Sequence, residues 1–342
     1  MDIKLLNGIY RTKFFIGKSV KEQNPNVMLE VLQNKESCGT FGVKDTGEIN
    51  YSVIDNFLSN GYVWNTIDTT SDRGRATDVS LLNPITYNNM TGSSSGTAIN
   101  VLYGLNSVGI GTDGGGSVLG PAISLNLYAT LLSGAGLKGT TIKKSTDGLE
   151  FTPGIGFITQ DFKTLKKCMG MFFKTCDVDI ERIVVDRELK KTIGEKLKGY
   201  NVTYIEDKIK FSREELIEDI RKILDMGDIF IYCENNIDFD GIGDTVLGCF
   251  GGCAREKQNF GRKKYIKILN MLDCSAVSIP LGEIGSSIVI VCKKGRENIH
   301  KVMKIADELN EEFRPGLFID YFLNYPLKNI DNRAFKNWRS HD

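Results

Sequence analysis

Two short serine-bearing segments lie close together in the sequence and contain the residue types that acyl transfer needs. The first is TGSSSG at residues 91–96, and the second is GTDGGGS at residues 111–117. Consecutive glycines permit a tight turn that presents several backbone N–H groups, and such groups stabilise the negative oxygen of a tetrahedral intermediate. A serine hydroxyl beside that turn becomes a nucleophile when a neighbouring base accepts its proton. The two segments therefore indicate serine-based chemistry at a carbonyl group.

Two other interpretations of these segments are open. Clusters of glycine and serine often form loops that have no chemical role. A glycine turn before a helix also binds phosphate, because free N–H groups and the helix dipole face the anion. The second segment lacks the Lys-Ser/Thr ending of a P-loop, which weakens the phosphate interpretation.

The elements that must position these segments indicate an α/β protein. A hairpin is expected at 38–57 with its turn at Asp45-Thr46-Gly47, and a loop is expected at 71–91. Ser212 and Glu215 form a capping box at the start of one helix. Helices are expected at 26–33, 96–105, 118–133, 157–174, 187–199, 212–227, 260–274 and 296–313, and strands at 107–111, 181–186, 200–206, 228–234, 275–282 and 286–294.

Composition excludes several classes of partner. Lys plus Arg and Asp plus Glu each number 43, so the formal net charge is zero and no nucleic-acid partner is expected. The chain has no run of 18 apolar residues and no signal peptide, so we expect a cytoplasmic protein with no membrane partner. The eight cysteines are then expected to be reduced.

Metal and histidine chemistry are not favoured. Cys249 and Cys253 are the one close cysteine pair, and no second pair at ligand spacing accompanies them, so we expect no metal and no cofactor. The two histidines, His300 and His341, lie far from the serines in sequence and have the pattern of solvated positions. A Ser-His-Asp triad is therefore not favoured.

Both serine segments resemble the signature of the amidase signature family, in which a GGSSGG-type turn precedes a helix and a GTDxGGSIRxPA segment follows it. Ser93 and Ser117 are 24 residues apart, as the family spacing requires, and Ser95 stands where the family usually has glycine. Residues 134–141, 156–172 and 270–282 are similar to further family motifs in the same order. The matching residues are Gly92, Ser93, Ser94 and Gly96, then Gly111, Thr112, Asp113, Gly115, Gly116, Ser117, Pro121 and Ala122.

The resemblance implies a role for each matched residue. Ser117 is the nucleophile, and Ser93 is a bridging serine that an unusual cis peptide usually precedes. The N–H groups of Gly114, Gly115 and Gly116 form the oxyanion hole, and Ser94, Thr112 and Asp113 bind substrate. The implied fold is a minimal version of the amidase-signature fold, with one mixed sheet sandwiched between helices in a single domain over residues 1–342.

The family's third catalytic residue is a lysine, and two positions compete for it. The segment VIDNFLSNG resembles the family's lysine motif, but the lysine position is then Ile54, which cannot accept a proton. The segment FGVKD offers Lys44 instead. Gly61 follows Ile54 by seven residues, as in the family, whereas Tyr51 follows Lys44 at that distance. This spacing favours Ile54 as the position of a lost lysine.

These departures favour a catalytically impaired amidase homologue that works as a binding or partner subunit. The family's arginine two residues after the nucleophile is Leu119, and a usual segment before the first turn is missing. The alternative is an active hydrolase of amides or esters, or an amide-transfer enzyme, in which Lys44 or a partner residue is the base. A purely structural scaffold is the weaker third interpretation, since both serines are retained.

The resemblance also implies partners. The ligand is a small amide-containing molecule or a peptide. Because segments that usually cover the pocket are absent, we expect a homodimer or a partner subunit to cover the face near Ser93 and Ser117. Leu119, Trp64 and Tyr62 are candidate contacts of that partner, although each could equally belong to the core.

Overall fold

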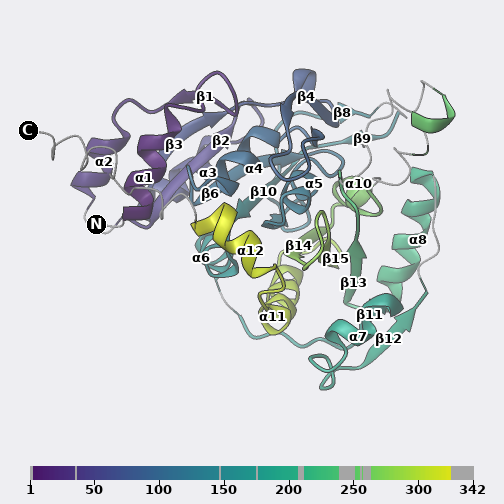
Figure 1. Ribbon diagram of the computed structural model, residues 1–342. Coiled ribbons are helices and arrows are strands. Elements are labelled where there is room, and N and C mark those ends of the chain that lie inside the picture. The colour runs from purple at the N-terminus through teal and green to yellow at the C-terminus, as the bar shows by residue number, and fades with distance from the viewer. Residues whose placement is uncertain are drawn as a thin grey trace, which may run out of the picture.

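The structure is a computed structural model (Figure 1), and it describes residues 3–34, 37–145, 148–174, 176–206, 212–238, 251–254, 256 and 263–324. One sheet of eleven strands runs through it. The order of the strands across the sheet is β1 (Val20–Gln23), β3 (Tyr62–Asp68), β2 (Gly39–Lys44), β6 (Val108–Asp113), β10 (Gly154–Thr159), β7 (Tyr128–Leu131), β14 (Ser275–Pro280), β15 (Ser287–Cys292), β13 (Ile229–Glu234), β11 (Ile183–Asp186) and β12 (Val202–Ile205).

The sheet is mixed, and helices cover both faces. β2 pairs in parallel with β3 and β6, β11 pairs in parallel with β12 and β13, and the other ladders are antiparallel. Two short hairpins stand apart from it, β4 (Thr77–Leu82) with β5 (Asn89–Thr91) and β8 (Lys143–Lys144) with β9 (Glu150–Phe151). The helices are α1 (Ile3–Thr12), α2 (Val27–Gln33), α3 (Tyr51–Ser59), α4 (Ser95–Leu102), α5 (Leu119–Ser124), α6 (Phe162–Phe172), α7 (Lys190–Ile193), α8 (Arg213–Met226), α10 (Ile266–Leu269), α11 (Asn298–Leu309) and α12 (Gly316–Phe318).

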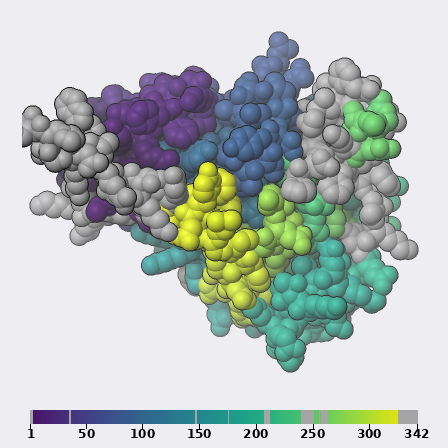
Figure 2. Space-filling view, in the orientation of Figure 1, coloured from purple at the N-terminus to yellow at the C-terminus, as the bar shows by residue number. Residues whose placement is uncertain are grey.

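Most of the core lies in two apolar layers, one on each face of the sheet, and a small third cluster lies between α1, α2 and β3. Strand side chains alternate between the layers, as the two-residue period of a strand requires. On β13, Ile229 and Ile231 belong to the layer under α3, α6 and α11, whereas Phe230 belongs to the layer under α4, α5, α8 and α10. Figure 2 shows the late segment with α11 and α12 on the surface between the N-terminal elements and those around residues 180–230. The predicted mixed sheet between helices is confirmed.

Several elements differ from those predicted. The expected hairpin with its turn at Asp45-Thr46-Gly47 is wrong, because β2 pairs in parallel and residues 51–59 form α3. Val53, Ile54 and Phe57 are the buried residues of α3, and this spacing is helical. The expected loop at 71–91 contains β4 and β5, and the expected helix at 118–133 is α5 followed by β7. Of the expected helix at 260–274, the described part contains only α10 and a 3-10 turn.

One glycine on β10 permits a close approach of two strands. A Cβ added at Gly156 would lie 2.0 Å from the backbone oxygen of Thr130. We expect Gly156→Ala to lower the free energy of unfolding by about 3 kcal/mol, because the backbone must shift. The matched control is Gly170→Ala on α6, where nothing lies within 4 Å of the added Cβ. That change should raise the free energy of unfolding by about 0.5–1 kcal/mol. Urea denaturation checks both values, and equal effects would contradict the expectation.

Candidate active site

Parallel pairing of β2 with β6 brings a lysine to the serine turns. Val43 lies opposite Ile110, so the carboxyl ends of the two strands meet at one edge of the sheet. Lys44 ends β2, and its Nζ donates hydrogen bonds to Thr112 Oγ1 at 2.9 Å and to the Thr112 carbonyl at 3.2 Å. The same Nζ lies 2.6 Å from Ser93 Oγ. The structure thus joins Lys44 to the first serine turn across 49 residues of sequence.

Lys44 is held where its neutral form is favoured. The residue is 5% exposed. Burial lowers the pKa of Lys44 from 10.5 to about 7, because desolvation disfavours the charged amine. Asp113 and Glu48 oppose this shift, and Lys143 adds to it. A large fraction of Lys44 is therefore unprotonated near neutral pH, which is the state that a general base requires.

The preferred position of a lost lysine, Ile54, is a core position in the structure. Ile54 lies on the buried side of α3 in an apolar cluster with Phe41, Val43 and Phe57. The contact with Ser93 that a lysine at 54 was expected to make is made by Lys44. The geometry therefore favours the alternative alignment.

The two serine turns touch through their backbones. The N–H of Ser94 donates to the carbonyl of Ser117 at 3.3 Å. Gly92 has a φ of +72°, which favours glycine, and a Cβ added there would lie 3.2 Å from Ser117 Cα. Ser117 is 9% exposed and Ser93 is 4% exposed. The described chain contains no cis peptide bond, so the expectation of one before Ser93 is wrong for this structure.

Asp113 shapes the turn that carries Ser117. Its carboxylate accepts the N–H of Gly116 at 2.6 Å and the N–H of Val118 at 2.7 Å, one on each side of the serine. Burial raises the pKa of Asp113, and these two N–H donors oppose the rise. Asp113 is fully buried, so its carboxylate positions the loop from within.

The three N–H groups expected to form the oxyanion hole differ in their hydrogen bonding. The N–H of Gly116 is donated to Asp113 in this structure, and its role in an oxyanion hole remains a prediction. In the part of the chain that the structure describes, the N–H groups of Gly114 and Gly115 have no acceptor, and both residues are half-buried. The ring of Phe151 on β9 packs against Gly114, because an added Cβ would lie 2.5 Å from Phe151 Cε2. Nothing in the sequence pattern indicated that contact.

The residues predicted to bind substrate are also engaged within the protein. Ser94 Oγ donates to the Thr112 carbonyl at 3.4 Å, and Thr112 Oγ1 accepts from Lys44. Ser94 and Asp113 are fully buried, and Thr112 is 5% exposed. These three residues hold the lysine and the two turns together. Their contact with substrate remains a prediction.

Two of the residues proposed as partner contacts belong to the core. Leu119 and Tyr62 are buried, and Trp64 is half-buried against the same apolar cluster as Tyr62. Leu119 and Tyr62 are therefore core residues, whereas a partner contact of the half-buried Trp64 remains a prediction.

The structure shows no metal centre among the residues that it describes. No group of three or more His, Cys, Asp or Glu side chains there could hold an ion. Cys253 is exposed, and Cys249 and His341 lie outside the described residues. His300 lies on α11. No helix of the described ranges has the length and apolar composition needed to cross a bilayer.

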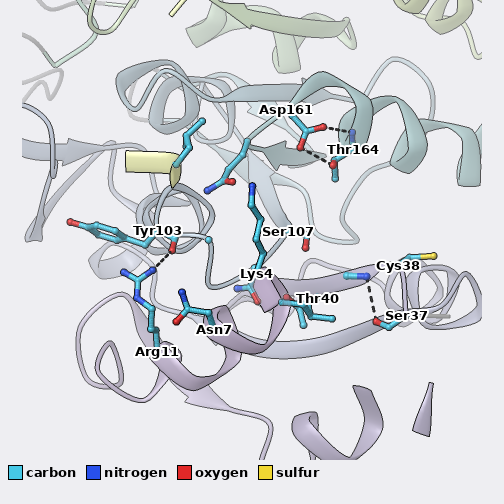
Figure 3. Close-up of a pocket in the computed structure, with 16 residues that line it drawn as sticks. Lys4, Asn7, Arg11, Ser37, Cys38, Thr40, Tyr103, Ser107, Asp161 and Thr164 are labelled. Carbon is cyan, nitrogen blue, oxygen red and sulfur yellow. Dashed lines mark hydrogen bonds between the residues drawn. The ribbon is translucent and has the colours of Figure 1, made fainter. Parts of the chain in front are cut away.

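A cavity of about 270 Å³ lies at the other end of the strands that carry the site (Figure 3). Gly39, which begins β2, and Ser107, which precedes β6, line this cavity. Lys44 and Asp113 end the same two strands. Neither they nor the two serines line the cavity. The candidate active site is therefore identified by the geometry of its side chains and is separate from this cavity.

The chain is similar to known amidases in sequence and in fold. The amidase family model matches residues 81–224. No curated protein sequence matches the chain. Three solved structures have a similar fold at 12% identity: an amidase (TM-score 0.62, 90% of this chain and 94% of that chain), the peptide amidase from Stenotrophomonas maltophilia (0.60, 90% and 94%) and the Kluyveromyces lactis allophanate hydrolase (0.62, 94% and 73%). The resemblance to the amidase signature family is confirmed, because the chain matches the amidase model over residues 81–224 and has the fold of amidase-signature enzymes.

Proposed function

We propose that the protein is an active amide hydrolase that uses Ser117 as nucleophile, Ser93 as proton bridge and Lys44 as base. The observation that carries this proposal is the 2.6 Å contact between Lys44 Nζ and Ser93 Oγ, made by a buried lysine whose pKa is lowered to about 7. The function expected first from the sequence, an impaired homologue, depended on a missing lysine. That argument loses its support once Lys44 stands beside Ser93.

The contacts of Lys44 suit a neutral amine. A neutral amine has two N–H donors and one lone pair. The Thr112 carbonyl can only accept, so it takes one N–H, and Thr112 Oγ1 takes the other. The lone pair then faces the hydroxyl of Ser93. Lys44 can therefore accept the Ser93 proton while Thr112 fixes the orientation of the amine.

The reaction follows from this arrangement. Ser117 Oγ attacks the carbonyl carbon of an amide as its proton passes to Ser93 and the Ser93 proton passes to Lys44. The free N–H groups of Gly114 and Gly115 stabilise the oxyanion. The proton then returns to the leaving amine, and the C–N bond breaks to leave an acyl-enzyme on Ser117. Water attacks that ester by the same proton route and releases the acid. The substrate class is a small amide or a peptide amide.

Covalent labelling tests the proposal. A fluorophosphonate probe should add one tag to the folded protein, and peptide mass spectrometry should place that tag on Ser117. Ser117→Ala should abolish the tag. Ser133→Ala is the matched control, because Ser133 is also buried and its hydroxyl donates to the carbonyl of Cys274 and not to either serine turn. It should leave labelling unchanged. A folded wild-type protein that takes no tag at Ser117 would support the impaired homologue instead.

A further inference from the structure

Two buried carboxylates each hold the backbone beside one of the serines. Asp113 accepts the N–H groups of Gly116 and Val118, which flank Ser117. Asp238 Oδ2 accepts the N–H of Thr91 at 2.7 Å, two residues before Ser93. Both carboxylates are almost completely inaccessible to solvent. A buried negative charge is costly unless a cation is near, so a positive charge close to both acids would stabilise their ionised forms.

Lys263 supplies that charge from a distant part of the chain. It is 6% exposed, and its stem lies against the turn of Ser117. A Cβ added at Gly116 would lie 3.2 Å from Lys263 Cδ, and a Cβ added at Gly120 would lie 3.2 Å from Lys263 Nζ. Burial raises the pKa of Asp113 and of Asp238, and the charge of Lys263 opposes both shifts. One ammonium therefore acts on both carboxylates.

A third buried acid fixes the backbone from which Lys263 extends. Glu234 ends β13 and is fully buried. Its carboxylate accepts the N–H of Lys264 at 2.8 Å and the N–H of Ile266 at 3.0 Å. The backbone oxygen of Ile266 would in turn lie 3.3 Å from a Cβ at Gly116, so this segment packs directly on the turn of Ser117. The position of Lys263 is thus set by the far half of the sheet.

We propose that Lys263 is a positioning residue that couples the two serine turns through Asp113 and Asp238. It fixes the position of Ser117 relative to Ser93 and does not contact substrate. The role in reactivity rests on the proposed function, whereas the effect on the backbone of the turns does not. Neither glycine turn contains a cation of its own, and the sequence KKYIK around Lys263 has no motif that would reveal the role.

Lys263→Met tests the proposal because methionine keeps an aliphatic stem against Gly116 and Gly120 and removes the charge. We expect the rate of fluorophosphonate labelling to fall by about 10- to 100-fold, as a misplaced nucleophile would. Hydrogen exchange should become faster in peptides that contain Thr91, Gly116 and Val118. The matched control is Lys301→Met on α11, since the Lys301 side chain is also mostly buried and pairs with Asp228, at 2.6 Å. It should change neither readout.

A double-mutant cycle separates the charge from simple packing. If Lys263 acts through Asp238, adding Lys263→Met to Asp238→Asn should lower the labelling rate by less than about threefold further. If the effects of the two substitutions on the labelling rate simply multiply in the double mutant, the proposed coupling is overturned. Unchanged exchange in Lys263→Met would overturn the positioning role. If wild type fails to label but Lys263→Met still speeds exchange at both turns, the proposed function fails and the positioning role stands.

Discussion

Lys44→Met is expected to slow covalent labelling of Ser117 by about 10²- to 10⁴-fold, the usual contribution of a general base. Methionine fills the volume of the lysine but has no lone pair that accepts the Ser93 proton. The fold should survive the change. Methionine suits the buried site better than an amine does, and this gain opposes the loss of the hydrogen bonds to Thr112 and Ser93. Labelling rates and thermal denaturation of the same samples measure the two effects separately.

Ile54→Met is the matched control for this substitution, because Ile54 is buried on α3 and the change conserves volume. It should leave the labelling rate within about twofold of wild type, since a volume-conserving change in the core disturbs its surroundings little. Near-wild-type labelling in Lys44→Met, with Ser117 still the tagged residue, would remove Lys44 from the mechanism. The base would then have to come from another group.

The labelling rate is also expected to rise with pH, with a midpoint near the lowered pKa of Lys44, which is about 7. Below the midpoint Lys44 is protonated and cannot accept the Ser93 proton, so the rate should increase about 100-fold between about pH 5 and about pH 8. The free energy of unfolding should also depend on the protonation of Lys44. Between about 7 and 10.5 the unfolded chain binds a proton at Lys44 that the folded chain does not, so the free energy of unfolding rises with pH there. This rise should be absent from Lys44→Met.

Two buried acids require a control in that experiment. Burial raises the pKa of Asp68 and of Asp238 to about 7 as well. Asp68 accepts from Asn100 and Thr66 beneath the turns. Asp68→Asn should keep the midpoint of the labelling profile, because the charge of Lys44 alone gates proton transfer. If Asp68→Asn shifts the midpoint of the labelling rate from about pH 7, or if the wild-type labelling rate does not change with pH, Lys44 is not the group that controls labelling.

Local signals in the sequence predicted many of the elements. The capping box of Ser212 and Glu215 is present at the start of α8, and the β-branched strands of the second half form where expected. The elements that were predicted wrongly depend on contacts between distant segments or lack a distinct periodicity. Residues 39–44 are suited to either a parallel or an antiparallel partner, and only long-range packing selects β3 and β6. Residues 118–133 are mostly apolar, and the residues of α5 and β7 are all buried, so periodicity could not separate the helix from the strand.

The serine turns were predictable because glycine spacing and serine position are local properties of the chain. The position of the proposed base, Lys44, was not predictable in this way, because it depends on the pairing of β2 with β6. Lys44 also lies outside residues 81–224, the part that matches the amidase family model. Within the sequence, the spacing around Ile54 favours the other alignment, and only the contact of Lys44 with Ser93 supports Lys44. The role of Lys263 is still harder to predict, since Thr91, Asp113 and Asp238 lie in three separate segments of the sequence.

The order of the strands has a consequence for synthesis of the chain. Residues before 160 supply one half of the sheet, from β1 to β7, and residues after 182 supply the other half. The two halves meet where β7 pairs with β14, whose residues are made more than 140 positions later. A nascent chain that ends before β14 therefore leaves β7 as an unpaired edge, which is a site for aggregation. Both serines and Lys44 thus emerge from the ribosome early, but the β7 edge of their half of the sheet is covered only when residues 275–280 emerge.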